Sequence, residues 1–176
     1  MKTLKNTRTA LLTFLLLPLL AVECYDEPFA PKLPEATQTG EGMMAAKVNG
    51  VVWEAQGGLI GENPEAFYSH ESGNFGIRGT YRADQVSSMN MAYDNMRTVG
   101  EYNLWGNIGQ VRGHHIRFNG KFGRCPAVQS NPGKLRITRL DTIEHIIAGT
   151  FEFDGICENE DTVKVRQGRF DVTYSH

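Results

Sequence analysis

From Ala45 onward, apolar and polar residues alternate with a period of two rather than 3.6. Side chains two residues apart share one face of a β-strand, so each alternating run predicts a strand with one buried face. Because no window has the pattern of an amphipathic helix, the alternation restricts the fold to the all-β class. The clearest runs place their apolar residues at Ile77, Gly79 and Tyr81, at Met89, Met91 and Tyr93, at Ile116, Phe118 and Phe122, and at Ile147, Gly149, Phe151 and Phe153.

Turn signals separate these runs. Asn49-Gly50, between apolar flanks, is the strongest short signal for a β-hairpin. In the last run the apolar phase shifts between Val165 and Phe170, which predicts a β-bulge at Gln167-Gly168. We therefore expect about eight to ten antiparallel strands in a single β-sandwich or flattened barrel over residues 45–176.

Residues 1–23 have the parts of a secretory signal. Lys2, Lys5 and Arg8 precede an apolar run from Ala10 to Val22. As a helix this run would span about 20 Å, which is short of the roughly 30 Å hydrocarbon core of a membrane. It therefore predicts export of the chain rather than a membrane-spanning anchor.

Cys24 follows this apolar run directly, at the position where a bacterial lipoprotein carries its lipid. Leu20-Ala21-Val22-Glu23-Cys24 resembles a lipobox, with Glu23 where a small residue is usual. Asp26-Glu27 resembles the acidic tag of some surface-exposed Bacteroidota lipoproteins. We predict lipidation of Cys24, and a protein held by its N-terminal lipid at the outer membrane or cell surface.

Residues 24–44 are predicted to carry the anchor cysteine and a tether. Pro28, Pro31 and Pro34 recur every third residue, which matches the three-residue turn of polyproline II. The following residues to Gly42 are polar or small and show no hydrophobic period.

With Cys24 assigned to lipid, Cys125 and Cys157 remain as an even pair in an oxidising compartment, which favours a disulfide. The alternative interpretation is a catalytic thiol, which would need a positioned histidine.

Charge is distributed unevenly along the chain. The sequence has 18 basic and 20 acidic residues, and removal of the predicted signal (three basic, one acidic) leaves 15 and 19, a net charge of −4. This acidity argues against nucleic-acid binding. The stretch from Tyr102 to Leu140 has no acidic residue and seven basic ones, whereas the stretch from Asp141 to Asp161 has seven acidic residues and no Lys or Arg. The seven basic residues are Arg112, Arg117, Lys121, Arg124, Lys134, Arg136 and Arg139.

Two interpretations of this charge pattern are open. The two segments can neutralise each other across strands, Arg117 and Lys121 pairing with Glu152 and Asp154. Alternatively, the basic segment forms a face for an anionic glycan or lipid head group. We favour the first interpretation, which requires the two segments to lie on neighbouring strands.

No motif in the sequence predicts catalysis, a cofactor or a metal. Ser69-His70-Glu71 has the residue types of a hydrolase triad, but adjacent residues of a strand point to opposite faces. The same alternation separates the rings of His114 and His115, and no further metal-ligand spacing accompanies them. The glycine runs at Gly73, Gly76 and Gly79 and at Gly106 and Gly109 lack the helix of a phosphate-binding loop.

Three carboxylates and five aromatic residues are further candidates for a functional site. The carboxylates Asp141, Glu144 and Glu152 have no spacing that pairs two of them as in a glycosidase. Aromatic residues are candidates to line a ligand cavity, although they more often belong to the core, and Trp105 is expected to be more exposed than Trp53. These aromatic residues are Trp53, Tyr68, Tyr81, Tyr102 and Trp105.

Several motifs together resemble a known family. Leu33-Pro34-Glu35-Ala36-Thr37-Gln38-Thr39-Gly40 is similar to its "LPPATQTG" tether, and Val48-Asn49-Gly50-Val51-Val52-Trp53 to its "VNGKVW" hairpin. Residues 149–153 and 168–174 resemble its closing hairpin, and residues 100–104 a middle strand. The family consists of β-rich Bacteroidota lipoproteins of unassigned function. The resemblance implies an envelope location and a β-rich fold, and transfers no catalytic or binding residue.

From these features we expect a cell-envelope lipoprotein that is a non-catalytic binding or accessory module. The expected partners are the membrane, through the lipid, and a glycan, a small apolar ligand or an envelope protein. The alternatives are a glycan-directed hydrolase whose site is assembled only in the fold, and a structural or adhesive surface module.

Overall fold

The computed structural model describes residues 31–56, 64–82, 86–105, 114–121, 123–128 and 130–175, and all regular secondary structure in these ranges is β-strand. No helix in these ranges is long and apolar enough to cross a membrane. The predicted signal, Cys24, Gly106, Gly109 and Phe122 lie outside the described residues.

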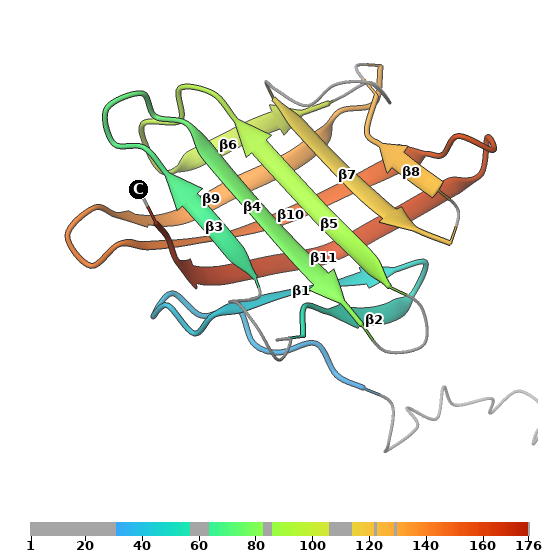
Figure 1. The fold of residues 1–176 in the computed structure, drawn as a ribbon, viewed down its shortest axis with the longest axis horizontal. Helices are drawn as coiled ribbons and strands as arrows, with labels where there is room; N and C mark the ends of the chain where they lie inside the picture. Colours follow the sequence, from blue (N-terminus) through green and yellow to red (C-terminus); the bar gives the residue numbers. More distant parts are fainter. Residues whose placement is uncertain are drawn as a thin grey trace, which may run out of the picture. The chain divides into compact units, whose positions relative to one another are not determined.

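The described strands form two antiparallel sheets, as the alternation predicts (Figure 1). The large sheet has six strands in the order β2-β1-β11-β10-β9-β6. They are β1 (Met43–Val48), β2 (Val51–Glu54), β6 (Gly100–Leu104), β9 (Gly133–Asp141), β10 (Ile146–Ile156) and β11 (Thr162–Thr173). The small sheet has five strands in the order β3-β4-β5-β7-β8. They are β3 (Glu65–Tyr68), β4 (Phe75–Tyr81), β5 (Ser87–Tyr93), β7 (His115–Gly120) and β8 (Gly123–Pro126).

The two sheets pack face to face as a β-sandwich rather than as a closed barrel. Their inner faces carry the apolar half of each alternating run, and the largest fully buried side chains include Phe75, Met89, Ile116, Leu135 and Phe170. The rings of Phe75 and Phe170, from opposite sheets, stack with their centroids 6.0 Å apart. Burial of these side chains, at about 25 cal/mol per Å² of apolar surface, holds the sheets together.

Contacts at two places join the sheets along their edges. Cys125 at the end of β8 forms the expected disulfide with Cys157, which follows β10. Ala127 and Gly155 form a β-bridge beside it. At the other edge, Ser175 bridges Phe67 of β3, so the end of the chain ties the large sheet to the small one. Edge strands β3 and β8 are thereby partly covered.

Two local predictions are confirmed. Asn49 and Gly50 connect β1 to β2 with φ of 50° and 84°, the left-handed pair that a tight hairpin requires. Gln167 has φ of 54°, and the register of β11 shifts at this point against both β1 and β10. This is the predicted bulge, and it explains why the apolar phase of the last strand changes.

The structured part of the chain begins before Ala45. Residues 34–42, which we call the strap, lie against the outer face of the large sheet and lead into β1 at Met43. Asp171 of β11 is fully buried beneath the strap. It accepts hydrogen bonds from Thr37 Oγ1 (2.7 Å) and from the backbone N–H groups of Thr39 (2.8 Å), Gly40 (2.8 Å) and Glu41 (3.3 Å).

Two arginines fix the rest of the strap. Arg169 donates to the carbonyl of Pro34 at 2.9 Å, and Arg139 donates to the carbonyl of Gln38. Residues 34–42 of the predicted tether are therefore a docked part of the domain, held by backbone and side-chain hydrogen bonds.

Candidate functional site

The fold places part of the basic segment beside the acidic segment, because β9 pairs with β10, and the rest of the basic segment on the other sheet. The predicted ion pairs of Arg117 and Lys121 with Glu152 and Asp154 are wrong, because β7 belongs to the small sheet and β10 to the large one. Glu152 instead pairs with Lys134 of the neighbouring strand β9 at 3.9 Å. Asp154 pairs with Arg166 of β11 at 2.6 Å.

Three arginines gather on the outer face of the small sheet. In one cross-strand row, Arg78 of β4 lies opposite Asn90 of β5, which lies opposite Arg117 of β7. In the next row, Arg124 of β8 lies opposite Asn119 of β7. Side chains on one face of neighbouring strands are close enough to interact directly or along the diagonal. We call Arg78, Arg117 and Arg124 the arginine cluster.

The arginine cluster lines a polar pocket of about 520 Å³. Ser88, Asn90 and Asn119 lie between the arginines, and the two amides both donate to Ser88 Oγ, at 3.5 and 3.2 Å. Glu158 stands at one end of the pocket, where a Cβ on Gly123 would lie 3.2 Å from its Oε2. The pocket is thus lined by three cations, three neutral polar side chains and one carboxylate.

The electrostatics of the cluster favour an anion. Burial lowers the pKa of the Arg117 guanidinium, and the nearby charges of Arg124 and Arg78 lower it further. Like charges that crowd one another disfavour their own ionised forms. An anion between them would remove this repulsion and accept charge-assisted hydrogen bonds.

A second hollow of about 310 Å³ continues the pocket along the same face, since both are lined by Arg78, Asn90 and Arg117. It ends at Phe67 of β3, whose side chain is 46% exposed. A Cβ on Gly76 would lie 2.2 Å from the ring of Phe67, so the ring rests directly on the glycine backbone. Glu65 lines the same hollow and lies opposite Arg78 in the register of β3 and β4.

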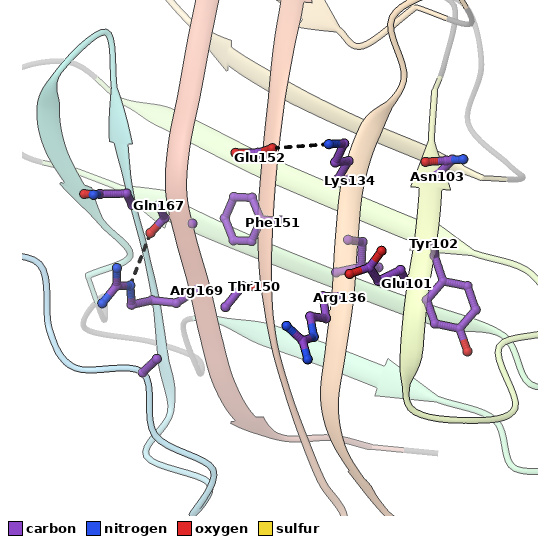
Figure 2. A pocket seen from close by; sticks show the side chains of 13 residues that line it. Glu101, Tyr102, Asn103, Lys134, Arg136, Thr150, Phe151, Glu152, Gln167 and Arg169 are labelled. Carbon is purple, nitrogen blue, oxygen red and sulfur yellow. Dashed lines mark hydrogen bonds and ion pairs between the residues drawn. The ribbon is translucent and has the colours of Figure 1, made fainter.

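The large sheet has a groove of about 560 Å³ on its outer face, lined by β6, β9, β10, β11 and Ala36 of the strap (Figure 2). Its charges alternate in sign: Glu101 lies opposite Arg136 in the sheet register, and Lys134 pairs with Glu152. Arg169 donates to the carbonyl of Gln167 at 3.2 Å. With three cations and two carboxylates in its lining, the groove has a smaller excess of positive charge than the pocket of the arginine cluster, which has three cations and one carboxylate.

The Ser-His-Glu sequence at residues 69–71 does not form a hydrolase triad. Ser69, His70 and Glu71 lie in the turn between β3 and β4, and Ser69 Oγ accepts the backbone N–H of Ser72 at 3.2 Å. Among the described residues, no group of three or more His, Cys, Asp or Glu side chains is arranged to hold a metal.

His114 and His115 diverge, as predicted. The ring of His114 stacks on Tyr93 with centroids 3.8 Å apart, and its Nε2 lies 3.1 Å from the carbonyl oxygen of Asp94. His115 is 6% exposed and lines the hollow between Arg117 and Phe67.

Two of the three candidate carboxylates have structural partners. Asp141 accepts the backbone N–H groups of Ile143 and Glu144, both at 2.9 Å, and the Arg139 guanidinium at 2.7 Å. These hydrogen bonds, that of Arg139 first, lower the pKa of Asp141 to about 2. Asp141 therefore stabilises the β9–β10 turn, Glu152 is bound to Lys134, and Glu144 supplies the backbone of the same turn.

Most of the candidate aromatic residues belong to the core. Trp53 and Tyr68 are buried between the sheets, and Tyr81 and Tyr102 pack against this core. Trp105 is more exposed than Trp53, as expected, and its ring meets His114 edge-on.

Sequence reasoning missed Arg78 and Phe67. Arg78 precedes the basic segment, and only the register of β4, β5 and β7 places it in a row with Arg117. The available signal for Arg78 was its position between Ile77 and Gly79, which places it on the polar face of a strand whose other face is apolar. No family model, curated protein or solved structure matches this chain.

Proposed function

We propose that this protein is an exported, non-catalytic binding module of the cell envelope, lipid-anchored through Cys24, which binds an acidic ligand on the outer face of the small sheet. One observation carries the proposal: three arginines distant in sequence line one polar pocket in which Glu158 is the single carboxylate. For Arg117 and Arg124 this arrangement supports the second interpretation, a face for an anionic ligand, whereas Lys134 of the basic segment pairs with Glu152 of the acidic segment as the first interpretation expects.

The location of the cluster suits a ligand reached from solution. Arg78 is exposed, and Arg117 and Arg124 are half-buried, so their guanidinium groups are partly desolvated without being enclosed. Partial desolvation strengthens charge-assisted hydrogen bonds to an anion. An acidic envelope glycan offers such anionic groups at a surface.

Binding can be tested with the purified full-length protein on an array of acidic and neutral glycans. We expect retention of acidic glycans, decreasing with added salt because the contacts are ionic. Arg117→Gln should reduce retention, whereas Arg136→Gln, which removes an exposed arginine from the opposite sheet, should not. Equal retention of neutral and acidic glycans, or equal effects of the two variants, would refute the proposal.

The anchor has a separate test. Cys24→Ala should move the protein from the membrane fraction to the soluble fraction of the envelope, because one lipid-bearing residue is removed and the domain is not altered. Unchanged fractionation of this variant would exclude lipidation at Cys24 and leave the binding proposal intact.

A further inference from the structure

The arginine cluster has the dimensions of a site for one oxyanion. With neighbouring strands about 4.8 Å apart, Arg78 and Arg117, two strands apart in one row, have Cα atoms roughly 10 Å from each other. Arg124 lies one strand further and two residues along from the position opposite Arg117. Arg78 and Arg124, three strands and two residues apart, have Cα atoms roughly 16 Å from each other. An anion midway is about 8 Å from each Cα, which leaves each extended arginine within hydrogen-bond distance of it, so three guanidinium groups can surround one anion above Asn90 and Asn119.

Three guanidinium groups match a tetrahedral oxyanion better than a carboxylate. A phosphate or sulfate monoester presents three terminal oxygens, and each can accept a planar guanidinium. A carboxylate presents two oxygens in one plane, and so leaves one of three converging cations without an oxygen of its own. The neutral amides of Asn90 and Asn119 add polar contacts below the anion.

The group that bears the oxyanion would extend toward Phe67. The hollow runs from the cluster along the same face to this ring. Because one face of the ring rests on Gly76, the other is turned outward as a flat apolar platform. The C–H face of a sugar ring packs on such a platform while its hydroxyl groups stay in water.

We infer that the small sheet binds a sugar carrying a phosphate or sulfate ester, with the ester on Arg78, Arg117 and Arg124 and the sugar ring on Phe67. This inference rests on the proposed function and names its ligand class. A free saccharide and the head group of a glycolipid supply the same chemistry.

The test uses the full-length protein and NMR titration at low salt, which detects weak binding. The probes are glucose 6-phosphate, glucose 6-sulfate, glucuronate, glucose and inorganic phosphate. Both esters should bind at least tenfold more tightly than glucuronate, and glucose should give no shifts. Each of Arg78→Gln, Arg117→Gln and Arg124→Gln should weaken binding of the esters about tenfold or more. Arg136→Gln, on the other sheet, is the matched control.

Phe67→Ala separates the sugar from the oxyanion. It should weaken binding of glucose 6-phosphate about three- to tenfold and leave the affinity for inorganic phosphate unchanged. Thermal unfolding of each variant shows that loss of binding is not loss of fold. Phosphatidylglycerol vesicles are the last binding probe. Tighter binding to these vesicles than to both sugar esters would overturn the inference.

The outcomes distinguish this inference from the proposed function. If glucuronate binds as tightly as the esters, or Phe67→Ala has no effect, the phosphosugar or sulfosugar assignment fails while an acidic ligand remains. If no anion binds, or the three arginine variants bind as the parent does, both fail.

Discussion

The contact between the strap and Asp171 gives the sharpest prediction. Asp171→Asn keeps the size of the side chain but removes its charge and replaces one acceptor oxygen with a donor NH₂. Asp171 accepts four hydrogen bonds from Thr37, Thr39, Gly40 and Glu41, and is completely buried under them. The carboxamide would turn its NH₂ toward at least one of these donors.

The magnitude follows from the number and kind of these bonds. A hydrogen bond to a charged group contributes about 1.5–3 kcal/mol, and an unsatisfied buried partner costs a similar amount. The strap donors can turn to water when the strap detaches, which limits the loss to roughly 3 kcal/mol. For a domain of this size, about 3 °C per kcal/mol gives a fall in Tm of roughly 10 °C.

The pH dependence of the stability difference between the parent and Asp171→Asn provides an independent check on the role of the Asp171 carboxylate. Burial raises the pKa of Asp171, but the hydrogen bonds from Thr37, Thr39, Gly40 and Glu41 together lower it by more, to below its usual range. A carboxyl group with a lowered folded-state pKa stabilises the fold above its unfolded pKa, and this stabilisation is lost as the pH falls through the folded value. The difference between parent and variant should therefore be greatest near neutrality and shrink below about pH 4.

Thermal unfolding measures the shift, and amide hydrogen exchange at Thr39, Gly40 and Glu41 measures release of the strap. Glu152→Gln is the control, because it removes an exposed carboxylate from the same face of the same sheet. If Asp171→Asn shifts Tm no more than this control does, or leaves the three amides protected, Asp171 does not hold the strap.

Three further predictions concern the packing and the turns. Replacing Cys125 and Cys157 together by Ala should lower the free energy of unfolding by about 3–4 kcal/mol, since the bond closes a loop between residues 32 positions apart. Denaturant unfolding measures this change, and a variant as stable as the parent would contradict the prediction. Gly79→Ala should cost about 1–3 kcal/mol, because its Cβ would lie 2.8 Å from Met44 Sδ and 2.9 Å from Trp53, and a Tm equal to that of the parent would show that the core has room. NMR titration of Asp141 should give a pKa of about 2, and Arg139→Gln should raise this pKa; an ordinary value in the parent would show that the turn bonds do not form in solution.

The sequence alone predicts the features that depend on near neighbours. Alternation places Ile77, Met89 and Phe151 on inner faces because the strand period is a local property. The phase change before Phe170 reports the bulge at Gln167 for the same reason. The cysteine count, together with the export expected from the predicted signal, was sufficient to predict the disulfide.

Features that depend on strand order could not be read from the chain. The ion pairs expected for Arg117 required β7 and β10 to be neighbours, and the topology puts them in separate sheets. Asp171 occupies an ordinary outward position of β11, and its donors lie about 130 residues earlier in a segment without hydrophobic pattern. Hydrogen bonds between residues so far apart in the sequence produce no periodic pattern from which they could be predicted.

The pairing of β1 with β11 also sets the order in which the fold can assemble. Met43 of β1 lies opposite Asp171, so the first strand of the large sheet has its partner at the other end of the domain. The β10–β11 hairpin needs only a short turn, whereas β1 must wait until β11 exists and then close a loop of more than a hundred residues at an entropic cost. A chain that emerges from a ribosome or a translocation channel with its N-terminus first therefore completes the large sheet, and traps the strap, only once β11 has emerged.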